Sequence, residues 1–582
     1  MNTFYTNERN TQILIALMKA HGIKKIIVSP GATNVCFVGS VQHDPFFEIY
    51  SSVDERSAAY LACGLAAESG EAVALSCTGA TASRNYVPGL TEAFYRKLPV
   101  LAITSTQHTG RIGQMAPQVI DRSAQMNDLV KLSVQLPTVH DTDDEWACEV
   151  AVNKALLELR HRGGGPVHIN LTTTYSRDFS VKELPAVRII NRICHNDVLP
   201  ELKRGRVGIF VGAHVKWDEE LLKLVDDFCE TYDGVVLCDQ TSNYRGKYRV
   251  LPAIVCMQSR YDSPCRKLDV LIHIGEISGA YMGFWANQVW RVSPDGNICD
   301  AFHKLRYVFE MEEKEFFRRY TAETESQNVY LDSTFIKEWH NECSKLSNKV
   351  PELPFSNIWI AQQTASKLPE GCALHLGILN SLRSWNFFET PDKVTGYSNT
   401  GGFGIDGGVS SLIGASLANR TKLYFGIIGD LAFFYDMNVI GNHHVGNNVR
   451  IMLVNNGRGT EFRNYNHPAA RFGDDADPYM AAAGHFGNKS HQLVKHYAED
   501  LGYEYMSASS KEEYLTHVGR FLTPELTDKP MLFEIFTDSA DESKALELMN
   551  HLEMSPEGAA KDMAKKILGP SGVQTLKKIL KK

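Results

Sequence analysis

Short apolar runs alternate with helix-like segments along nearly the whole chain, and this alternation is the feature that most restricts the fold. In the first third, KKIIVSPG, EAVALSCTG and PVLAITS have the composition of buried strands, and RSAAYLACGLAAESG has that of a small-residue helix between two of them. Strands that are joined through helices pair in parallel, and helices then cover both faces of the sheet. The sequence therefore predicts an α/β protein built on mostly parallel sheets.

The alternation falls into three blocks, which we expect to be three domains because 582 residues exceed the usual size of one domain. The predicted boundaries are 1–185, 190–345 and 350–545, followed by a basic tail over 546–582. The third block repeats the rhythm of the first. We therefore expect the two blocks to share a fold, although no repeat is visible in the residues themselves.

Composition restricts the functions open to the chain. An excess of acidic over basic residues gives a net charge of −8, which provides no general attraction for nucleic acid. No apolar run approaches the ~18–20 residues that span a bilayer, and the N-terminus lacks the basic and apolar regions of a signal peptide. The 12 cysteines are scattered without a CxxC pair, as is typical of a reducing compartment. We expect a cytoplasmic globular protein that does not bind nucleic acid.

The strongest chemical signal lies between residues 426 and 459, where one strand ends at Gly429-Asp430 and the next ends at Asn455-Asn456. Ligands of an open parallel sheet bind beyond the carboxyl ends of its strands, so Asp430 and Asn456 are expected on adjacent strand ends. A carboxylate, an amide oxygen and a backbone carbonyl form a site suited to Mg²⁺, which often shares its ligands with phosphate oxygens. The alternative is a turn and an Asn-Gly hairpin without a ligand, but the pairing of the two motifs favours the metal site.

These paired motifs resemble the diphosphate-binding signature of thiamine diphosphate enzymes, in which GD is followed about 26 residues later by NN. The form GDLAFFYDMN…VNNGRG is similar to that of the menaquinone-pathway 2-succinyl-5-enolpyruvyl-6-hydroxy-3-cyclohexene-1-carboxylate synthases. SPGATN, DERSAAYLACGLA, ALSCTGATASRNYVPGLTEAFY, GPVHINL and SNTGGFGIDGG extend the resemblance over nearly the whole chain. The resemblance implies pyrimidine-binding, central and diphosphate-binding domains in that order, with thiamine diphosphate and Mg²⁺ as cofactors.

The resemblance also implies roles for single residues. Glu55 matches the catalytic glutamate that hydrogen-bonds the aminopyrimidine ring and promotes loss of the C2 proton, whereas a helix cap or a surface residue is the alternative. Gln118 matches a glutamine beside the reacting carbon, and Ile405 matches the apolar residue that holds the cofactor bent. The implied cofactor contacts are Pro30, Glu55, Thr78, Gly79, Gly404, Ile405, Gly429, Asp430, Leu431, Ala432, Asn456 and Gly459, and the implied metal ligands are Asp430, Asn456 and the backbone carbonyl of Arg458.

The positions for substrate binding depart from the resembled family, which uses arginines to bind the carboxylates of two polyanionic substrates. Two of those arginine positions hold Thr33 and Thr400 here, and ITSTQH at 103–108 lacks a third. Arg383, in NSLRSW, is the only candidate for a substrate-binding arginine that this chain retains. Each lost charge-assisted hydrogen bond is worth about 1.5–3 kcal/mol. We therefore expect a substrate other than that of the menaquinone step, in a rebuilt pocket formed by Thr33, Asn34, Arg383 and Phe462.

The expected activity is decarboxylation of a pyruvate-like 2-oxo acid with transfer of the acyl fragment to a second carbonyl, a carboligase reaction. Glu461 is a candidate acid/base in that reaction, and an exposed ion-paired glutamate is the alternative. The other candidate functions are a simple decarboxylase that releases an aldehyde and a non-catalytic cofactor-binding homologue. Retention of Glu55 argues against the last, because diphosphate binding alone does not need that carboxylate.

Partners and further cofactors follow from the resemblance. EAFYRKLPVLAIT is also similar to acetolactate synthases, which carry FAD in the central domain, but 190–345 shows no flavin motif and FAD is not expected. A homodimer or homotetramer is implied, because the two halves of each cofactor sit on different subunits. The tail KDMAKKILGPSGVQTLKKILKK is basic and amphipathic. Contact with a membrane surface is open to such a tail, but we favour packing on the protein itself.

Overall fold

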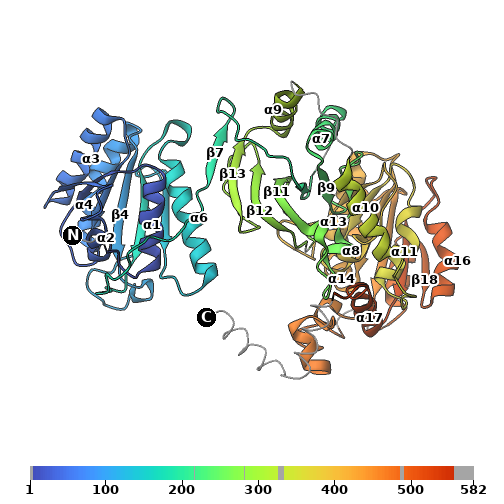
Figure 1. Cartoon of the computed structure of the whole chain (residues 1–582). Coiled ribbons are helices and arrows are strands. Elements are labelled where there is room, and N and C mark those ends of the chain that lie inside the picture. The colour runs from blue at the N-terminus through green and yellow to red at the C-terminus, as the bar shows by residue number, and fades with distance from the viewer. Residues whose placement is uncertain (1–3, 215–216, 281, 326–332, 485–489, 556–582) are drawn as a thin grey trace. The chain divides into compact units, whose positions relative to one another are not determined.

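The structure is a computed structural model that describes residues 4–214, 217–280, 282–325, 333–484 and 490–555. Figure 1 shows the strands and helices of the chain and labels many of them. The chain divides into two compact units, Met1–Val198 with Asp295–Glu310, and Leu199–Pro294 with Met311–Lys582. Each unit is described by itself below.

The first sheet has six parallel strands in the order β2-β1-β3-β4-β6-β5. Two apolar clusters cover its faces, one with α1 and α6 and the other with α3 and α5. The strands are β1 (Lys25–Val28), β2 (Glu48–Ser51), β3 (Val73–Cys77), β4 (Val100–Thr106), β5 (Leu132–Leu136) and β6 (Val167–Thr172), and the helices include α1 (Arg9–Ala20), α2 (Val35–Val41), α3 (Glu55–Ser69), α4 (Ala80–Asn85), α5 (Val87–Tyr95) and α6 (Thr142–Glu158).

The local sequence determines where helix α3 begins and ends and how closely it packs on α5. The Asp54 side chain accepts a hydrogen bond from the Arg56 N–H and caps the start of the helix. Gly70 ends it in the left-handed conformation, with φ 68°. A Cβ on Gly89 would lie 2.4 Å from the Ala59 Cβ, so the close packing of α3 on α5 requires a glycine there.

In the second unit five strands of the middle block pair in the order β10-β9-β8-β11-β12, and in the first unit β13 pairs with β7. The pairing of β13 with β7 is parallel. The strands are β7 (Asn191–Cys194), β8 (Val207–Val211), β9 (Val235–Cys238), β10 (Arg249–Val250), β11 (Lys267–Ile274), β12 (Trp285–Val292) and β13 (Leu305–Glu310), and the helices are α7 (Glu219–Tyr232), α8 (Ala253–Cys256), α9 (Glu313–Glu325) and α10 (Thr334–Ser347).

The third sheet again has six parallel strands, in the order β15-β14-β16-β17-β19-β18. The strands are β14 (Ala373–Leu376), β15 (Thr395–Tyr397), β16 (Tyr424–Gly429), β17 (Val449–Asn455), β18 (Glu504–Ala508) and β19 (Met531–Phe536). The helices include α11 (Asn357–Thr364), α12 (Asn380–Trp385), α13 (Gly408–Ala418), α14 (Asp430–Asp436), α15 (Leu493–Asp500), α16 (Lys511–Phe521) and α17 (Ser539–Met549).

The order of strands in the first and third sheets is the same when each block is numbered along the chain: second, first, third, fourth, sixth, fifth. This identity confirms the predicted duplication of fold between the first and third blocks. The predicted α/β class with parallel sheets is also confirmed.

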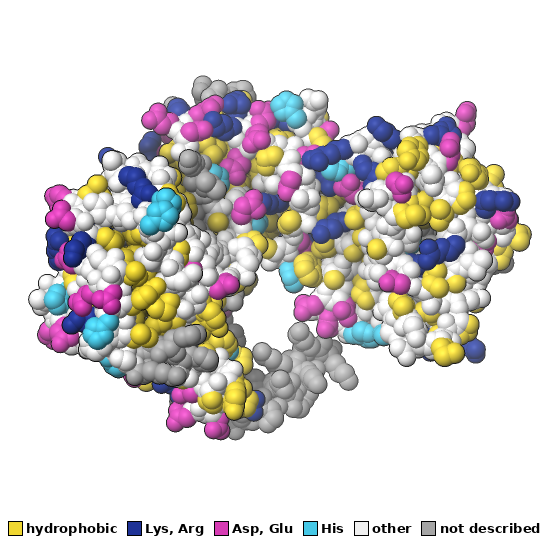
Figure 2. All heavy atoms as spheres, turned by 180° about the vertical axis from the view of Figure 1, so that it is seen from behind, with side chains coloured by type: hydrophobic (Ala, Val, Ile, Leu, Met, Phe, Trp, Pro, Cys, Tyr) yellow, Lys and Arg dark blue, Asp and Glu magenta, His cyan; other side chains and the backbone are white. Residues whose placement is uncertain are grey.

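Surface and composition add three observations. Figure 2 shows basic and acidic side chains interspersed over the visible face. All twelve cysteines lie among the described residues, and none of them pairs with another. Within the described part of the chain, no helix is both long and apolar enough to cross a membrane. Most of the predicted basic tail, from residue 556 onward, lies outside the described residues.

Candidate functional site: a cofactor-binding groove

Three adjoining cavities lie along the carboxyl ends of β14, β16 and β17, which are neighbours in the third sheet. Their volumes are about 20, 100 and 290 Å³. The first two share Gly377, Ile378, Ile405 and Ala432, and the last two share Asn380, Glu461 and Glu542. The result is a continuous groove at the sheet edge where open parallel sheets bind ligands.

The middle cavity contains the predicted metal ligands. Asp430 follows β16 and Asn456 follows β17, and both side chains line the cavity. The Asp430 residue is only 6% exposed, and its burial raises the pKa of its carboxyl to about 7, while the N–H groups of Leu431, Gly457 and Arg458 act in the opposite direction. A divalent cation at this carboxyl would favour its ionised form. The donor set, one carboxylate and one amide beside a backbone carbonyl, fits Mg²⁺ carrying phosphate oxygens.

The neighbours of these ligands hold them in place. The Asn456 Oδ1 accepts a hydrogen bond from the Thr460 hydroxyl at 2.6 Å. The Arg458 guanidinium pairs with Asp477 at 2.7 Å, so the charge of that side chain is balanced by an acidic neighbour. The predicted cofactor contacts Gly429, Leu431, Ala432 and Gly459 line the same cavity.

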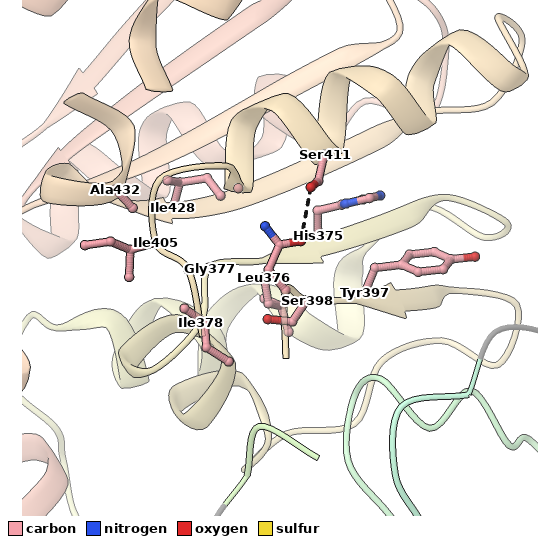
Figure 3. Close-up of a pocket in the computed structure, with 13 residues that line it drawn as sticks. His375, Leu376, Gly377, Ile378, Tyr397, Ser398, Ile405, Ser411, Ile428 and Ala432 are labelled. Carbon is pink, nitrogen blue, oxygen red and sulfur yellow. Dashed lines mark hydrogen bonds between the residues drawn. The ribbon is translucent and has the colours of Figure 1, made fainter. Parts of the chain in front are cut away.

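The smallest cavity is mainly apolar and contains Gly404 and Ile405 (Figure 3). Figure 3 shows Ile405 and Ala432 near Ile428. The Ser411 hydroxyl donates a hydrogen bond to Asn399 Oδ1 at 3.1 Å. The ring of His375 stacks on Tyr397 with centroids 5.1 Å apart. Burial lowers the pKa of His375 to about 4, so this imidazole is neutral near pH 7.

The largest of these three cavities contains an ion pair. Arg383 Nη1 lies 2.5 Å from Glu461 Oε1, and these side chains are 11% and 21% exposed. With its amide nitrogen facing the carboxylate, Asn380 donates to Glu461 Oε2 at 2.7 Å and accepts from the Glu461 N–H at 3.1 Å. Glu461 is therefore ion-paired, but inside the groove rather than on an open surface. The ring of Phe462 packs edge-on against His467, with centroids 5.1 Å apart.

Several groove residues were not predicted from the sequence, notably His375, Asn380 and Glu542. Glu542 lies on α17 and accepts the Asn357 N–H with both carboxyl oxygens at 3.0 Å. Burial raises the pKa of Glu542 to about 7. Asn380 comes shortly after a buried strand that ends near Gly377, and a polar residue in that place is a sequence signal for the groove. Nothing in the sequence around Glu542 predicts that it lines the groove.

The first unit holds Glu55 at the first position of α3, where it is partly buried. The capping hydrogen bond of this helix is made by Asp54, so Glu55 does not cap it. None of the described residues hydrogen-bonds the Glu55 carboxyl. Its carboxylate is thus available to an external group.

The other predicted residues of this unit meet at the carboxyl ends of β1 and β3, where Pro30 is exposed. The Thr33 and Thr78 hydroxyl oxygens are 2.7 Å apart, and Asn34 donates to the Ser29 carbonyl at 3.0 Å. Thr33 and Asn34 are only 4% and 1% exposed, so their side chains are bonded within the unit.

A glycine is required at residue 79 in this region. A Cβ on Gly79 would lie 2.6 Å from the Gln118 carbonyl oxygen, so the loop that carries Gln118 needs a glycine at this contact. The Gln118 side chain itself is exposed.

Arg122, a buried cation at this edge of the first sheet, was also not predicted from the sequence. Arg122 is 2% exposed and donates to the Ser105 carbonyl at 3.0 Å, the same carbonyl that accepts the Thr33 hydroxyl at 3.0 Å. Burial lowers the pKa of Arg122 to about 10. An isolated arginine in a loop carries no sequence signal for this position.

The fold is that of a thiamine diphosphate-dependent enzyme. Residues 9–126 match the family described as thiamine pyrophosphate enzyme, N-terminal TPP binding domain.

Relatives define the family more closely. The 2-succinyl-5-enolpyruvyl-6-hydroxy-3-cyclohexene-1-carboxylate synthase of Bacteroides fragilis is 31% identical over 576 residues, covering 94% of this chain and 99% of that protein. The synthase of the same name from Desulfotalea psychrophila is 27% identical over 545 residues, covering 89% and 96%. The chain belongs to the 2-succinyl-5-enolpyruvyl-6-hydroxy-3-cyclohexene-1-carboxylate synthase family and is an enzyme that uses thiamine diphosphate.

Among solved structures, a Rhodococcus jostii RHA1 thiamine diphosphate-dependent 4-hydroxybenzoylformate decarboxylase matches 91% of this chain and 99% of its own. The sequence identity is 16% and the TM-score is 0.39.

Proposed function

We propose that the protein is a Mg²⁺-dependent carboligase that decarboxylates a pyruvate-like 2-oxo acid and joins the acyl fragment to a second carbonyl compound. The observation that carries this proposal is the 290 Å³ cavity that continues the cofactor cavity through Asn380, Glu461 and Glu542. Ligand pockets typically measure ~300–1,000 Å³. This cavity has room for a small second substrate beside the cofactor, which a plain decarboxylase does not need.

We propose the following roles for residues of the chain in binding the cofactor and in catalysis. Thiamine diphosphate supplies the stabilisation of negative charge on the acyl carbon. Asp430, Asn456 and the Arg458 carbonyl would hold Mg²⁺ and, through it, the diphosphate. Glu55 would hold a proton at the pyrimidine ring, and Gln118 would lie beside the reacting carbon. Ile405 would keep the two rings of the cofactor together.

Glu461 would exchange a proton with the oxygen of the acceptor carbonyl as the new bond forms. The position of this carboxylate supports the role, because it borders both the cofactor cavity and the larger cavity. Its pairing with Arg383 at 2.5 Å fixes the direction of the carboxylate. Phe462 lines the cofactor cavity beside it and would contact the substrate.

The substrate proposed here differs from the one in the name of the relatives. Thr33 and Thr400 are uncharged, are 4% and 6% exposed, and stand where the resembled family places arginines. Bidentate arginine pairs are the strong way to bind carboxylates. Their loss supports a donor with a single carboxylate, pyruvate being the simplest.

The test is to incubate the enzyme with thiamine diphosphate, Mg²⁺ and a panel of 2-oxo acids, with and without added aldehydes or ketones. We expect release of CO₂ from a short 2-oxo acid and a 2-hydroxy ketone or acid detected by mass spectrometry when an acceptor is present. Free aldehyde as the sole product under both conditions would instead identify a simple decarboxylase. No CO₂ from any donor would contradict both proposals.

We also expect at least a homodimer, with an interface above the ~2,000 Å² of obligate pairs. Val53 precedes α3 and Tyr60 and Leu61 lie on it, and these apolar side chains are 84%, 48% and 54% exposed, as is typical of a surface that a partner covers. Leu61→Asp is expected to give monomers without activity in analytical ultracentrifugation and CO₂-release assays. Leu515→Asp, at a leucine 51% exposed on α16, is the matched control and should remain an active oligomer. A fully active monomer would contradict this prediction.

The proposed location is the cytoplasm. Twelve unpaired cysteines, most of them buried, support a reducing compartment.

A further inference from the structure

The 290 Å³ cavity, here called the acceptor chamber, has a polar wall and a smaller apolar one. The polar wall consists of Asn380, Arg383, Ser384, Glu461, Asn464, Asn466, His467 and Glu542, and the apolar wall consists of Met257, Ile358, Pro468 and Leu546. The chamber is walled by α12 on one side and by the segment that follows Gly459 on the other. Since Glu461 and Asn380 also line the cofactor cavity, a molecule in the chamber would lie next to the reacting groups.

The charges in the chamber wall balance one another. Among the described wall residues, Arg383 is the only one with a permanent positive charge, and Glu461 binds it at 2.5 Å. A carboxylate or phosphate entering the chamber would have to compete with Glu461 for Arg383. It would also face the carboxyl groups of Glu461 and Glu542, and like charges at close range are destabilising.

The rest of the polar wall consists of side chains that donate and accept hydrogen bonds. Asn464 approaches Glu461 Oε2 at 3.5 Å, and Asn466 is an exposed amide that lines the chamber. His467 Nδ1 accepts the Ala469 N–H at 3.1 Å, which leaves Nε2 to carry the ring proton and donate it. The Ser384 hydroxyl can donate and accept.

Amides, a hydroxyl and an imidazole N–H, spaced around a small cavity, match a ligand that carries several hydroxyl groups. Each hydroxyl of such a ligand donates once and accepts, as these side chains do. A purely apolar aldehyde would leave several of these groups without a partner, which costs binding energy. A carboxylate ligand is disfavoured by the balanced ion pair.

We infer that the acceptor chamber binds an uncharged, polyhydroxylated aldehyde or ketone, a sugar-like carbonyl compound, as the second substrate. This inference rests on the proposed carboligase function and names its acceptor class. In the reaction the bond between the carboxyl carbon and the carbonyl carbon of the donor breaks and CO₂ leaves. The acyl carbon forms a bond to the carbonyl carbon of the acceptor, whose oxygen gains a proton and becomes a hydroxyl. No oxidant or reductant is required.

The experiment compares acceptors with pyruvate as donor and enzyme loaded with thiamine diphosphate and Mg²⁺. Glyceraldehyde, erythrose and dihydroxyacetone are the neutral probes, and their phosphate esters and glyoxylate are the anionic probes. We expect kcat/KM for the neutral probes to exceed that for their phosphate esters by about tenfold or more, the size of one charge-assisted hydrogen bond. Equal or greater use of the anionic probes overturns the inference, as does CO₂ release without coupling to any neutral probe.

The proposed function has its own readout in the same assay. Absence of CO₂ release with every donor overturns the carboligase proposal, and the inference falls with it. CO₂ release combined with a preference for anionic acceptors overturns the acceptor class alone. The two failures are thus distinguishable.

Two variants test the chamber directly. Asn466→Ala should raise KM for glyceraldehyde by about 2- to 12-fold, the value of one neutral hydrogen bond. Asn341→Ala, at an exposed asparagine on α10, is the matched control and should leave that KM unchanged. If both variants change KM for glyceraldehyde equally, Asn466 does not bind this acceptor in the chamber.

The second variant, Glu461→Gln, removes the charge that balances Arg383. Although it slows turnover, it should raise the ratio of kcat/KM for glyceraldehyde 3-phosphate over glyceraldehyde by about tenfold or more, because an anion then no longer competes with the Glu461 carboxylate for Arg383. The ratio cancels any general loss of catalysis. An unchanged ratio would show that the ion pair does not set acceptor charge and would overturn the inference.

Discussion

Replacement of Glu55 by glutamine is expected to slow hydrogen–deuterium exchange at C2 of bound thiamine diphosphate by about 10²–10⁴-fold, the usual contribution of a positioned acid/base group. Glutamine has nearly the same shape and still forms hydrogen bonds, so folding and cofactor affinity should be largely retained. It has no ionisable proton, however, and cannot stabilise the proton shift on the aminopyrimidine ring. Exchange is followed by NMR after acid quench with the cofactor saturated, because free cofactor exchanges through solvent base.

The Glu55 prediction has two controls on the same helix. Glu68→Gln changes an exposed glutamate of α3 and should exchange at the unmodified rate. Asp54→Asn changes the cap of α3 and should affect stability by about 0.5–2 kcal/mol at most, without the loss of exchange. A Glu55→Gln protein that exchanges C2 at the original rate would show that this carboxyl has no part in cofactor activation.

The fold and the placement of the proposed metal ligands at one sheet edge could be predicted because their signals are local. Each strand of the third block is a short buried run, and the polar residues that follow it must lie at the sheet edge. Asp430 and Asn456 are therefore placed by the sequence alone once β16 and β17 are recognised as parallel neighbours. The common strand order of the first and third sheets follows from the same local rhythm, since it repeats without any repeat of residues.

The acceptor side of the groove could not be predicted in the same way. Arg383 and Glu461 are 78 residues apart, and Asn357 and Glu542 are 185 residues apart. Their contacts arise from packing of α12 near β16 and of α17 against α11, which cannot be read from a short stretch of sequence. The same holds for β7 and β13, whose parallel pairing joins segments more than a hundred residues apart within the first unit. Long-range pairing, rather than weak local propensity, limited the prediction.

Replacement of Asp430 by alanine is expected to lower the Mg²⁺-dependent affinity for thiamine diphosphate by about 100-fold or more. Loss of residues that merely support a metal ligand costs 10–100-fold, and Asp430 is the single carboxylate in the proposed ligand set. The measurement is isothermal titration calorimetry with Mg²⁺ present and with EDTA. Asp474→Ala, at an aspartate whose side chain is 97% exposed, is the control and should bind as the original protein does. Unchanged affinity of Asp430→Ala would place the metal elsewhere.

The milder variant Asp430→Asn separates binding from folding. Burial raises the pKa of Asp430 to about 7 in the protein without metal, well above 3.8, so the folded state binds a proton that the unfolded state has released. Ionisation of Asp430 therefore costs stability progressively as the pH rises from about 4 to about 7, and the full cost remains above pH 7. Because asparagine carries no charge, Asp430→Asn should raise the Tm of the metal-free protein at pH 8 and change it little at pH 4. With saturating Mg²⁺ and thiamine diphosphate the order should reverse, since the original protein then gains the binding energy that the variant has lost. A variant that is less stable than the original at pH 8 without metal would show that Asp430 has a structural role instead.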